Sequence, residues 1–383
     1  MIDFDLHREL SILADEAQPA DLESRVRRRA RTIRTRRTVT AVVGVVVLVA
    51  AAVGTYTVVR RAISAPVVPA RTCILNPVPK VLTVPAGGST ANFVFIDPTG
   101  RYVASGNVLW HDGVPKLIPG GDGATQFTAF AVNASGEAVG TSGVVAAVYR
   151  DGRVTKLTGG DPVGPTGINA AGDVVGYVGL IGNFGWSAVV WRAGHPDTPQ
   201  VLPRLAPDGS TNAWAITDNG TILGDALDGR VTPDANPIQY AYEWLPDGTG
   251  RKLAMPPGYQ FASVRSASGD WAAGFVGQQT LSGTVPKSQK PAMWDLRTGK
   301  VTIPTASSEI DVDSLGELLV PGGEAGGRSY VLSGGKQIPL RPPAGTDMTT
   351  NTYMATAMNA DGTVVVGALI DENHVTTPLV WRC

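Results

Sequence analysis

The stretch Phe130–Gly143, "FAVNASGEAVGTSG", sets two short apolar runs on either side of the turn "NASG". Short apolar runs separated by a turn signal are typical of a β-hairpin. Glycine suits the last position of such a turn because it adopts a positive φ at little steric cost, and the asparagine before it bonds to the turn backbone. This stretch therefore predicts two antiparallel strands joined by a tight turn.

Related stretches recur along the chain, among them "TGINAAGDVVGYVG" at residues 166–179 and "TAMNADGTVVVGAL" at residues 356–369. Their turn glycines lie 36 to 49 residues apart, which is the range of repeat architectures. The sequence therefore contains seven copies of one unit. The turn glycines of these copies are Gly100, Gly136, Gly172, Gly220, Gly269, Gly316 and Gly362.

Each of the first six copies continues with a second hairpin, whose first strand ends near an aromatic residue in most copies. Four short strands per copy at this period predict an all-β fold, a seven-bladed β-propeller in which each copy is one blade. We expect the repeated aromatic residues to fill the blade cores rather than to form a ligand cage. In the first five copies they are Trp110, Tyr149, Trp191, Trp244 and Trp294, and the sixth copy has Val331 instead.

The seventh copy contains three strands and ends with "PLVWRC" at Cys383. Its missing strand should resemble "VPKLIP" of the first copy, and "VPKVLTVP" at Val78–Pro85 stands before the first complete copy. We therefore expect a 3+1 closure, in which the last blade takes three strands from the C-terminal end and one from the N-terminal end.

The closure brings the only two cysteines, Cys73 and Cys383, to the same blade. Outside the cytoplasm thiols persist as disulfides, so a Cys73–Cys383 bridge is expected. In the chain-entropy model, closing a loop of about 310 residues contributes about 5 kcal/mol. The alternative is a pair of unpaired cysteines.

The copies resemble the extracellular repeats of the HAF family. The resemblance covers about residues 79–383 and rests on "NASGEAVG", "NAAGDVVG" and "NADGTVVVG", with "VVWR" and "LVWR" downstream. It implies an extracellular, WD-repeat-like propeller. It brings no catalytic motif, because the family is defined by its repeats and propellers serve as enzymes, binders and scaffolds alike.

The segment before the repeats differs sharply from them. Eight arginines lie within residues 25–37, and a 21-residue apolar run, Val39–Val59, follows. This run is long enough to cross a membrane as one helix, and the arginines place the N-terminus in the cytoplasm. The expected domains are a cytoplasmic tail at 1–38, a transmembrane helix at 39–59, a linker at 60–72 and an extracellular propeller at 73–383. A signal peptide cleaved after "VVPA", before Arg71, is the alternative.

The cytoplasmic tail suggests a partner of its own. Residues 3–24 are acidic and amphipathic, and they resemble the tails of membrane-anchored regulators of extracytoplasmic-function sigma factors. They are therefore expected to form a helical hook for a cytoplasmic protein. The arginine run is explained as a topology signal and a contact for anionic lipids.

The composition and the absence of known motifs limit the classes of biochemical function that the sequence supports. A net charge of -1, with 17% charged and 43% hydrophobic residues, excludes wholesale disorder and argues against nucleic-acid binding. The four histidines and two cysteines have no metal-ligand spacing, and neither a phosphate loop nor a "GxSxG" elbow occurs. We therefore predict no catalytic residues, metal or cofactor. Acidic residues from different blades that meet as a glycosidase-like pair remain an alternative.

The stretch between the second and third strands is short in the first two copies and long in others, such as "DALDGRVTPDANPIQY" in the fourth. Insertions at one equivalent place lie on one face, where loops carry binding residues, although simple loop growth would produce the same pattern. The predicted binding residues are Phe184, Trp186, Asp228, Arg230, Asp234, Asn236, Tyr240, Asp371, Glu372 and His374.

Taken together, the sequence predicts a single-pass membrane protein whose extracellular propeller is a non-enzymatic binding or sensing module for an unidentified protein or glycan. One alternative is a transmembrane regulator, whose tail holds a signalling partner such as a sigma factor. The other is an extracellular polysaccharide hydrolase or lyase.

Overall fold

A computed structural model describes residues 79–121, 126–159, 163–180, 183–232, 237–278, 287–306, 311–321 and 328–382. The chain divides into two units, Met1–Pro69 and Ala70–Cys383, and all described residues belong to the second. They form strands and connecting turns without a helix, which confirms the all-β class for this part of the chain. None of them forms a helix long and apolar enough to span a membrane. The predicted tail, span and linker, together with Cys73 and Cys383, lie outside the described residues.

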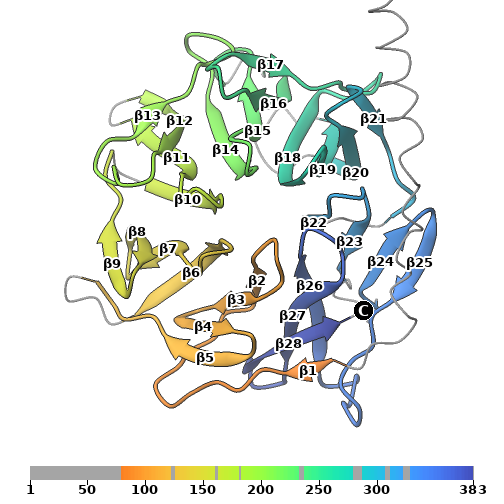
Figure 1. Ribbon diagram of the computed structural model, residues 1–383. Helices are drawn as coiled ribbons and strands as arrows, with labels where there is room; N and C mark the ends of the chain where they lie inside the picture. The colour runs from red at the N-terminus through yellow and green to blue at the C-terminus, as the bar shows by residue number, and fades with distance from the viewer. Residues whose placement is uncertain are drawn as a thin grey trace, which may run out of the picture. The chain divides into compact units, whose positions relative to one another are not determined.

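The strands follow one another in antiparallel groups of four (Figure 1). The first group is β2 (Phe95–Ile96), β3 (Tyr102–Ser105), β4 (Val108–His111) and β5 (Val114–Leu117). The second is β6 (Phe127–Val132), β7 (Ala138–Ser142), β8 (Val145–Arg150) and β9 (Arg153–Lys156). The third is β10 (Val163–Ile168), β11 (Val174–Leu180), β12 (Asn183–Trp191) and β13 (Gln200–Val201).

The next two groups are joined through a single parallel residue pair, Gln239 with Phe261. The fourth group is β14 (Thr211–Ile216), β15 (Ile222–Leu227), β16 (Gln239–Trp244) and β17 (Gly250–Lys252). The fifth is β18 (Phe261–Ser268), β19 (Trp271–Gln278), β20 (Lys287–Asp295) and β21 (Lys300–Thr302). The sixth is β22 (Asp311–Val312), β23 (Leu318–Val320), β24 (Tyr330–Ser333) and β25 (Lys336–Pro339).

The last sheet combines the two ends of the described chain. It contains β26 (Thr352–Met358), β27 (Val364–Ile370), β28 (Thr376–Arg382) and the N-terminal strand β1 (Lys80–Val81), which pairs antiparallel with β28. Further hydrogen bonds extend this join, including Leu82 N to Pro378 O at 3.0 Å and Thr90 Oγ1 to Thr376 O at 2.8 Å.

The first strands of successive groups also contact one another in order: β2 with β6, β6 with β10, β10 with β14, β14 with β18, β18 with β22, β22 with β26, and β26 with β2 again. Within this unit, the first strands surround a common centre in Figure 1, and the later strands of each group lie outside them. The hydrophobic core consists of separate clusters, and most of them fill the space between two neighbouring groups.

The repeated aromatic residues are core residues, as predicted. Each tryptophan at this place is fully buried, and its indole N–H donates to a backbone oxygen just after the outermost strand of the preceding group. A buried indole needs such a partner, so each bond ties one sheet to its neighbour. The bonds run from Trp110 to Thr83, Trp191 to Thr158, Trp244 to Pro203, Trp294 to Ala254 and Trp381 to Arg341, at 2.7 to 2.8 Å.

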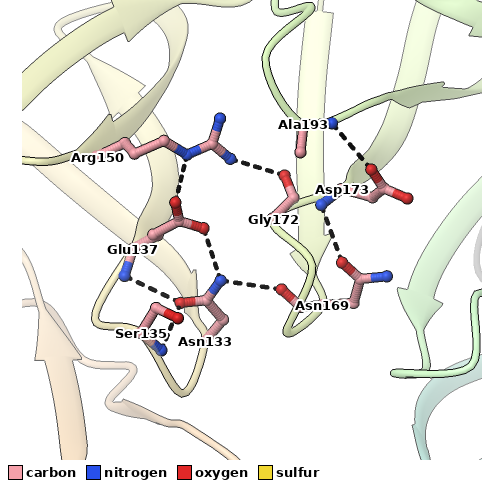
Figure 2. Close-up of polar contacts among 8 residues, drawn as sticks. All are labelled: Asn133, Ser135, Glu137, Arg150, Asn169, Gly172, Asp173 and Ala193. Atoms are coloured by element: carbon pink, nitrogen blue, oxygen red, sulfur yellow. Dashed lines mark hydrogen bonds and ion pairs between the residues drawn. The ribbon is translucent and has the colours of Figure 1, made fainter.

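The asparagine turns connect neighbouring groups as well (Figure 2). Asn133 accepts hydrogen bonds from Ser135 N and Glu137 N, which closes its own turn around Gly136 with a φ of 76°. Its side-chain amide donates to Glu137 Oε2 at 2.7 Å and to Asn169 O of the next turn at 2.9 Å. Asn133 is thus both a local cap of its own turn and a link to the following unit.

The glycine of the "VVG" motif has a different role, because the first strand of the group lies directly against it. A Cβ at this glycine would lie 1.9 to 2.2 Å from a backbone oxygen of that strand, which no side chain can accept. In all five groups that have the glycine, the first strand shifts register by one residue at its partner, as in a β-bulge. The glycines are Gly140, Gly176, Gly224, Gly274 and Gly367.

The two remaining groups carry Ala104 and Val320 at the corresponding place. The described pairing of their first two strands, Phe95–Ile96 with β3 and Asp311–Val312 with β23, contains no register shift. Glycine and bulge therefore occur together, and a close backbone approach explains the motif.

The bulge can be tested with Gly140→Ala. The new Cβ would lie 1.9 Å from Thr128 O, so we expect the free energy of unfolding to fall by roughly 2–4 kcal/mol and the unfolding midpoint to fall with it. Gly229→Ala is the matched control, because its nearest atom would be Pro237 Cβ at 3.6 Å. Equal midpoints for the two variants in denaturant titrations would contradict the close approach.

Candidate functional site

The bulges place one residue per first strand outside the regular pairing. These residues are Phe130, Thr166, Trp214, Arg265 and Thr356. The two threonines have a structural task. Thr166 Oγ1 donates to Ala213 O of β14 at 2.8 Å, and Thr356 Oγ1 donates to Val94 O, directly before β2, at 2.6 Å, so each connects its group to the next.

Trp214 and Arg265 occupy the same position in β14 and β18 but make a different contact. The Arg265 guanidinium lies over the Trp214 ring, with Cζ 4.1 Å from the ring centre. This is a cation–π arrangement, which is strongest with tryptophan. Trp214 is half-buried and Arg265 is exposed, so the pair is accessible from solvent.

A buried carboxylate supports this pair. Asp225, on β15, accepts hydrogen bonds from Trp214 Nε1 at 2.6 Å, Asn212 Nδ2 at 2.9 Å and Ser263 Oγ at 2.8 Å. Burial raises the pKa of Asp225, and the three hydrogen bonds and the charge of Arg265 offset part of this rise. The carboxylate thereby fixes the position of the Trp214 indole through the hydrogen bond to its Nε1.

Two further aromatic residues from the third group complete the cluster. Tyr177 on β11 meets Trp186 on β12 edge-to-face at 4.9 Å between ring centres, and it lies 6.0 Å from Trp214. A Cβ at Gly164 would lie 2.2 Å from Cζ of Tyr177, so the ring packs directly on that glycine. We call Tyr177, Trp186, Trp214, Asp225 and Arg265 the aromatic–arginine cluster. Trp186 is its most exposed aromatic ring at 39%.

Of the ten predicted binding residues, Trp186 lies in this cluster. Phe184 lies on the same strand, β12, two residues before it, and Asp234 and Asn236 fall outside the described residues. The fourth group holds three more predicted residues. Asp228 accepts from Ile238 N at 2.7 Å and closes the base of its loop, Arg230 is exposed, and the Tyr240 ring lies 3.6 Å from Lys252 Nζ.

The last three predicted residues lie in the turn between β27 and β28. The Asp371 carboxylate accepts from Asn373 N at 2.9 Å and Val375 N at 2.8 Å, which forms the turn, and His374 has a φ of 61°. Glu372 and His374 are exposed. No contact in the described chain joins this turn to the aromatic–arginine cluster.

Tyr177, Trp214, Asp225 and Arg265 were not among the residues predicted from the sequence. A signal for them was present. Tyr177 and Asp225 directly follow the "VVG"-type glycine, and Trp214 and Arg265 replace the threonine that two other copies have at the bulge. Copies of a repeat that depart from the others at the same positions indicate a function beyond packing.

A second set of buried carboxyls lies in the sixth group. Asp313 replaces the turn asparagine; its Oδ1 accepts from Leu315 N and Glu317 N, and its buried Oδ2 has no hydrogen-bond partner among the described residues. Burial and the neighbouring Glu317 carboxylate raise the pKa of Asp313 to about 7. Burial also raises the pKa of Asp311 to about 6. No cluster of three potential metal ligands occurs among the residues described.

Asp313→Asn tests this carboxyl, because asparagine restores the donor that Asn133 supplies to Glu137. A raised folded-state pKa stabilises the fold below the ordinary pKa of about 4, and this contribution is lost as the pH rises through 7. We therefore expect the variant to match the parent near pH 4 and to exceed its free energy of unfolding by about 4 kcal/mol at pH 8. Melting curves across this range measure the effect. Parallel pH profiles for the two proteins would refute the assignment.

Comparison with known proteins identifies the class of fold. No protein family model matches the chain, and no curated protein matches it in sequence. Among solved structures, the β-propeller domain of the trilobed protease from Pyrococcus furiosus is similar, with a TM-score of 0.52 and 12% identity over 76% of this chain and 94% of that chain. The described chain therefore has a β-propeller fold.

Two solved structures of proteins named as enzymes have lower TM-scores. The oligogalacturonate lyase from Vibrio parahaemolyticus has a TM-score of 0.49 and 10% identity over 80% of this chain and 91% of that chain. The gluconolactonase from Xanthomonas campestris has a TM-score of 0.40 and 14% identity over 83% of this chain and 99% of that chain. At such identities a likeness concerns the fold alone.

Proposed function

We propose that this protein is a membrane-anchored extracellular β-propeller that binds a ligand without transforming it. The observation that carries the proposal is the aromatic–arginine cluster. It presents an exposed indole and a guanidinium stacked on a second indole, and such groups dominate the energetics of recognition surfaces. It also lies where these copies depart from the repeat, as expected of a site added to a structural scaffold.

The arrangement of Asp225 favours binding over catalysis. Its carboxyl oxygens accept from three protein donors and its side chain is buried, so it positions Trp214 and offers no reactive atom to solvent. A general acid or base must reach the proton that it transfers. Asp225 is therefore a positioning residue in this proposal.

The proposed architecture is a seven-bladed ring of HAF-type repeats with a 3+1 closure. The pairing of β1 with β28 and the contact of β26 with β2 support it, since they join the last group of strands to the first. The proposed membrane span at Val39–Val59, the cytoplasmic tail and the Cys73–Cys383 bridge rest on the sequence alone. The role of residues 3–24 as a hook for a signalling partner stays a prediction on the same basis.

The binding function predicts a measurable dependence on the cluster. The full chain, applied to a printed array of glycans and peptides, should bind a restricted set of them. Trp186→Ala and Arg265→Gln should each weaken that binding about tenfold or more, because each removes a principal contact. Val144→Ala is the matched control, since Val144 is 98% exposed and lies on another hairpin. Binding that is absent, or equal in all variants, would contradict the proposal.

One observation favours the second candidate, an extracellular polysaccharide hydrolase or lyase. Asp225 has a raised pKa beside an arginine, a combination that is common at catalytic sites. The two functions can be distinguished by chromatography of the glycans that the array identifies, after each has been incubated with the full chain. Recovery of intact glycan supports binding alone. Cleaved glycan that disappears with Asp225→Asn, at an unchanged unfolding midpoint, would establish the enzyme instead.

A further inference from the structure

A second candidate site lies where the chain passes from β25 to β26. A cavity of about 780 Å³ opens there, lined by residues 341–346 and 348–353 of the connecting segment and by Arg328. This volume is within the range of small-ligand sites. The cavity shares no lining residue with the aromatic–arginine cluster, so the two are different sites.

The connecting segment is fixed at both ends. Arg341 O accepts from the buried Trp381 Nε1 at 2.7 Å, and Tyr353 OH donates to Leu340 O at 2.9 Å. Within the segment, Asn351 donates to Asp347 O through its backbone N at 3.1 Å and through its side chain at 2.7 Å. The cavity is therefore formed before any ligand arrives, which lowers the entropic cost of binding.

The charge of the cavity is positive. Arg328 and Arg341 are exposed, and neither guanidinium has a carboxylate or hydrogen-bond partner among the described residues. No acidic residue lines the cavity. Asp347 lies in the same segment, and its Oδ1 accepts hydrogen bonds from Thr349 N at 2.8 Å and from Thr349 Oγ1 at 2.7 Å. By contrast, Arg150 and Arg192 of other groups are held by Glu137 and Asp173.

The remaining lining combines hydroxyl and amide groups with small apolar surfaces. Thr346, Thr350 and Asn351 supply polar atoms, and Pro342, Pro343 and Met348, which is 41% exposed, supply apolar surface. Hydroxyl groups of a sugar bond to such polar side chains, and its C–H faces pack on apolar ones. Arginine adds paired N–H donors that match the two oxygens of a carboxylate.

We propose that this cavity binds an acidic saccharide, whose uronate carboxylates pair with Arg328 and Arg341. The inference goes beyond the proposed function, because it names a second site and a ligand class and does not depend on the aromatic–arginine cluster. Its failure would leave the role of that cluster unaffected.

The test is isothermal titration of the full chain with a tetrasaccharide of uronic acids and with the same tetrasaccharide after reduction of its carboxylates. We expect the acidic form to bind and the reduced form to bind at least tenfold more weakly. Arg328→Gln and Arg341→Gln should each weaken binding of the acidic form about tenfold, and the double variant should abolish it. Both side chains are exposed, so unfolding midpoints should not change.

Two controls make the result specific. Arg153→Gln removes an exposed arginine from β9, and Trp186→Ala removes a residue of the aromatic–arginine cluster; neither should change the affinity for the tetrasaccharide. Equal binding of the acidic and reduced forms, no binding of either, or an affinity that is insensitive to Arg328 and Arg341 would each overturn the proposal. A loss of affinity with Trp186→Ala alone would also overturn the proposal, because it would indicate that the saccharide binds at the aromatic–arginine cluster.

Discussion

The antiparallel pairing of β1 with β28 places Lys80 opposite Val380 and Val81 opposite Leu379, so it joins the two ends of the described chain. Without it, β28 would present a free edge of unpaired backbone groups, which is a site for aggregation. Hydrogen bonds of Thr90 and Asn92 with Thr376, and of Val94 with Thr356, reinforce the join. Contacts this distant in sequence carry a large loop-closure cost, and the last sheet is complete only when the two ends of the described chain meet.

The backbone geometry within each group determines where the residues of the candidate site lie. A glycine on the second strand allows the first strand to approach, the approach coincides with a bulge, and the bulge leaves one side chain outside the regular pairing. Where this side chain is threonine, it bonds the next group; where it is Trp214 or Arg265, it forms part of the aromatic–arginine cluster. The same bulge thus holds a threonine that connects neighbouring groups in some copies and a member of the proposed binding site in others.

The sequence was sufficient for the strands, the turns and the burial of the tryptophans, because period, turn glycines and apolar pattern are local properties. Trp186 was among the predicted binding residues, because it lies in the inserted stretch of the third copy. Trp214, Arg265 and Asp225 were not, because the geometry that unites them arises from register shifts and from contacts between β14, β15 and β18. The cavity beside Arg328 and Arg341 could not be predicted either, since it depends on how Trp381 and Tyr353 anchor the segment between them.

The proposed closed and exported ring is the central claim, and a non-reducing peptide map of the protein purified from membranes tests it most directly. The pairing of β28 ends at Arg382, adjacent to Cys383, and β1 begins seven residues after Cys73. The account predicts a crosslinked peptide pair that contains Cys73 and Cys383 and that separates on reduction. Two free thiols in the unreduced protein would contradict it, because an exported ring that brings these residues together should oxidise them.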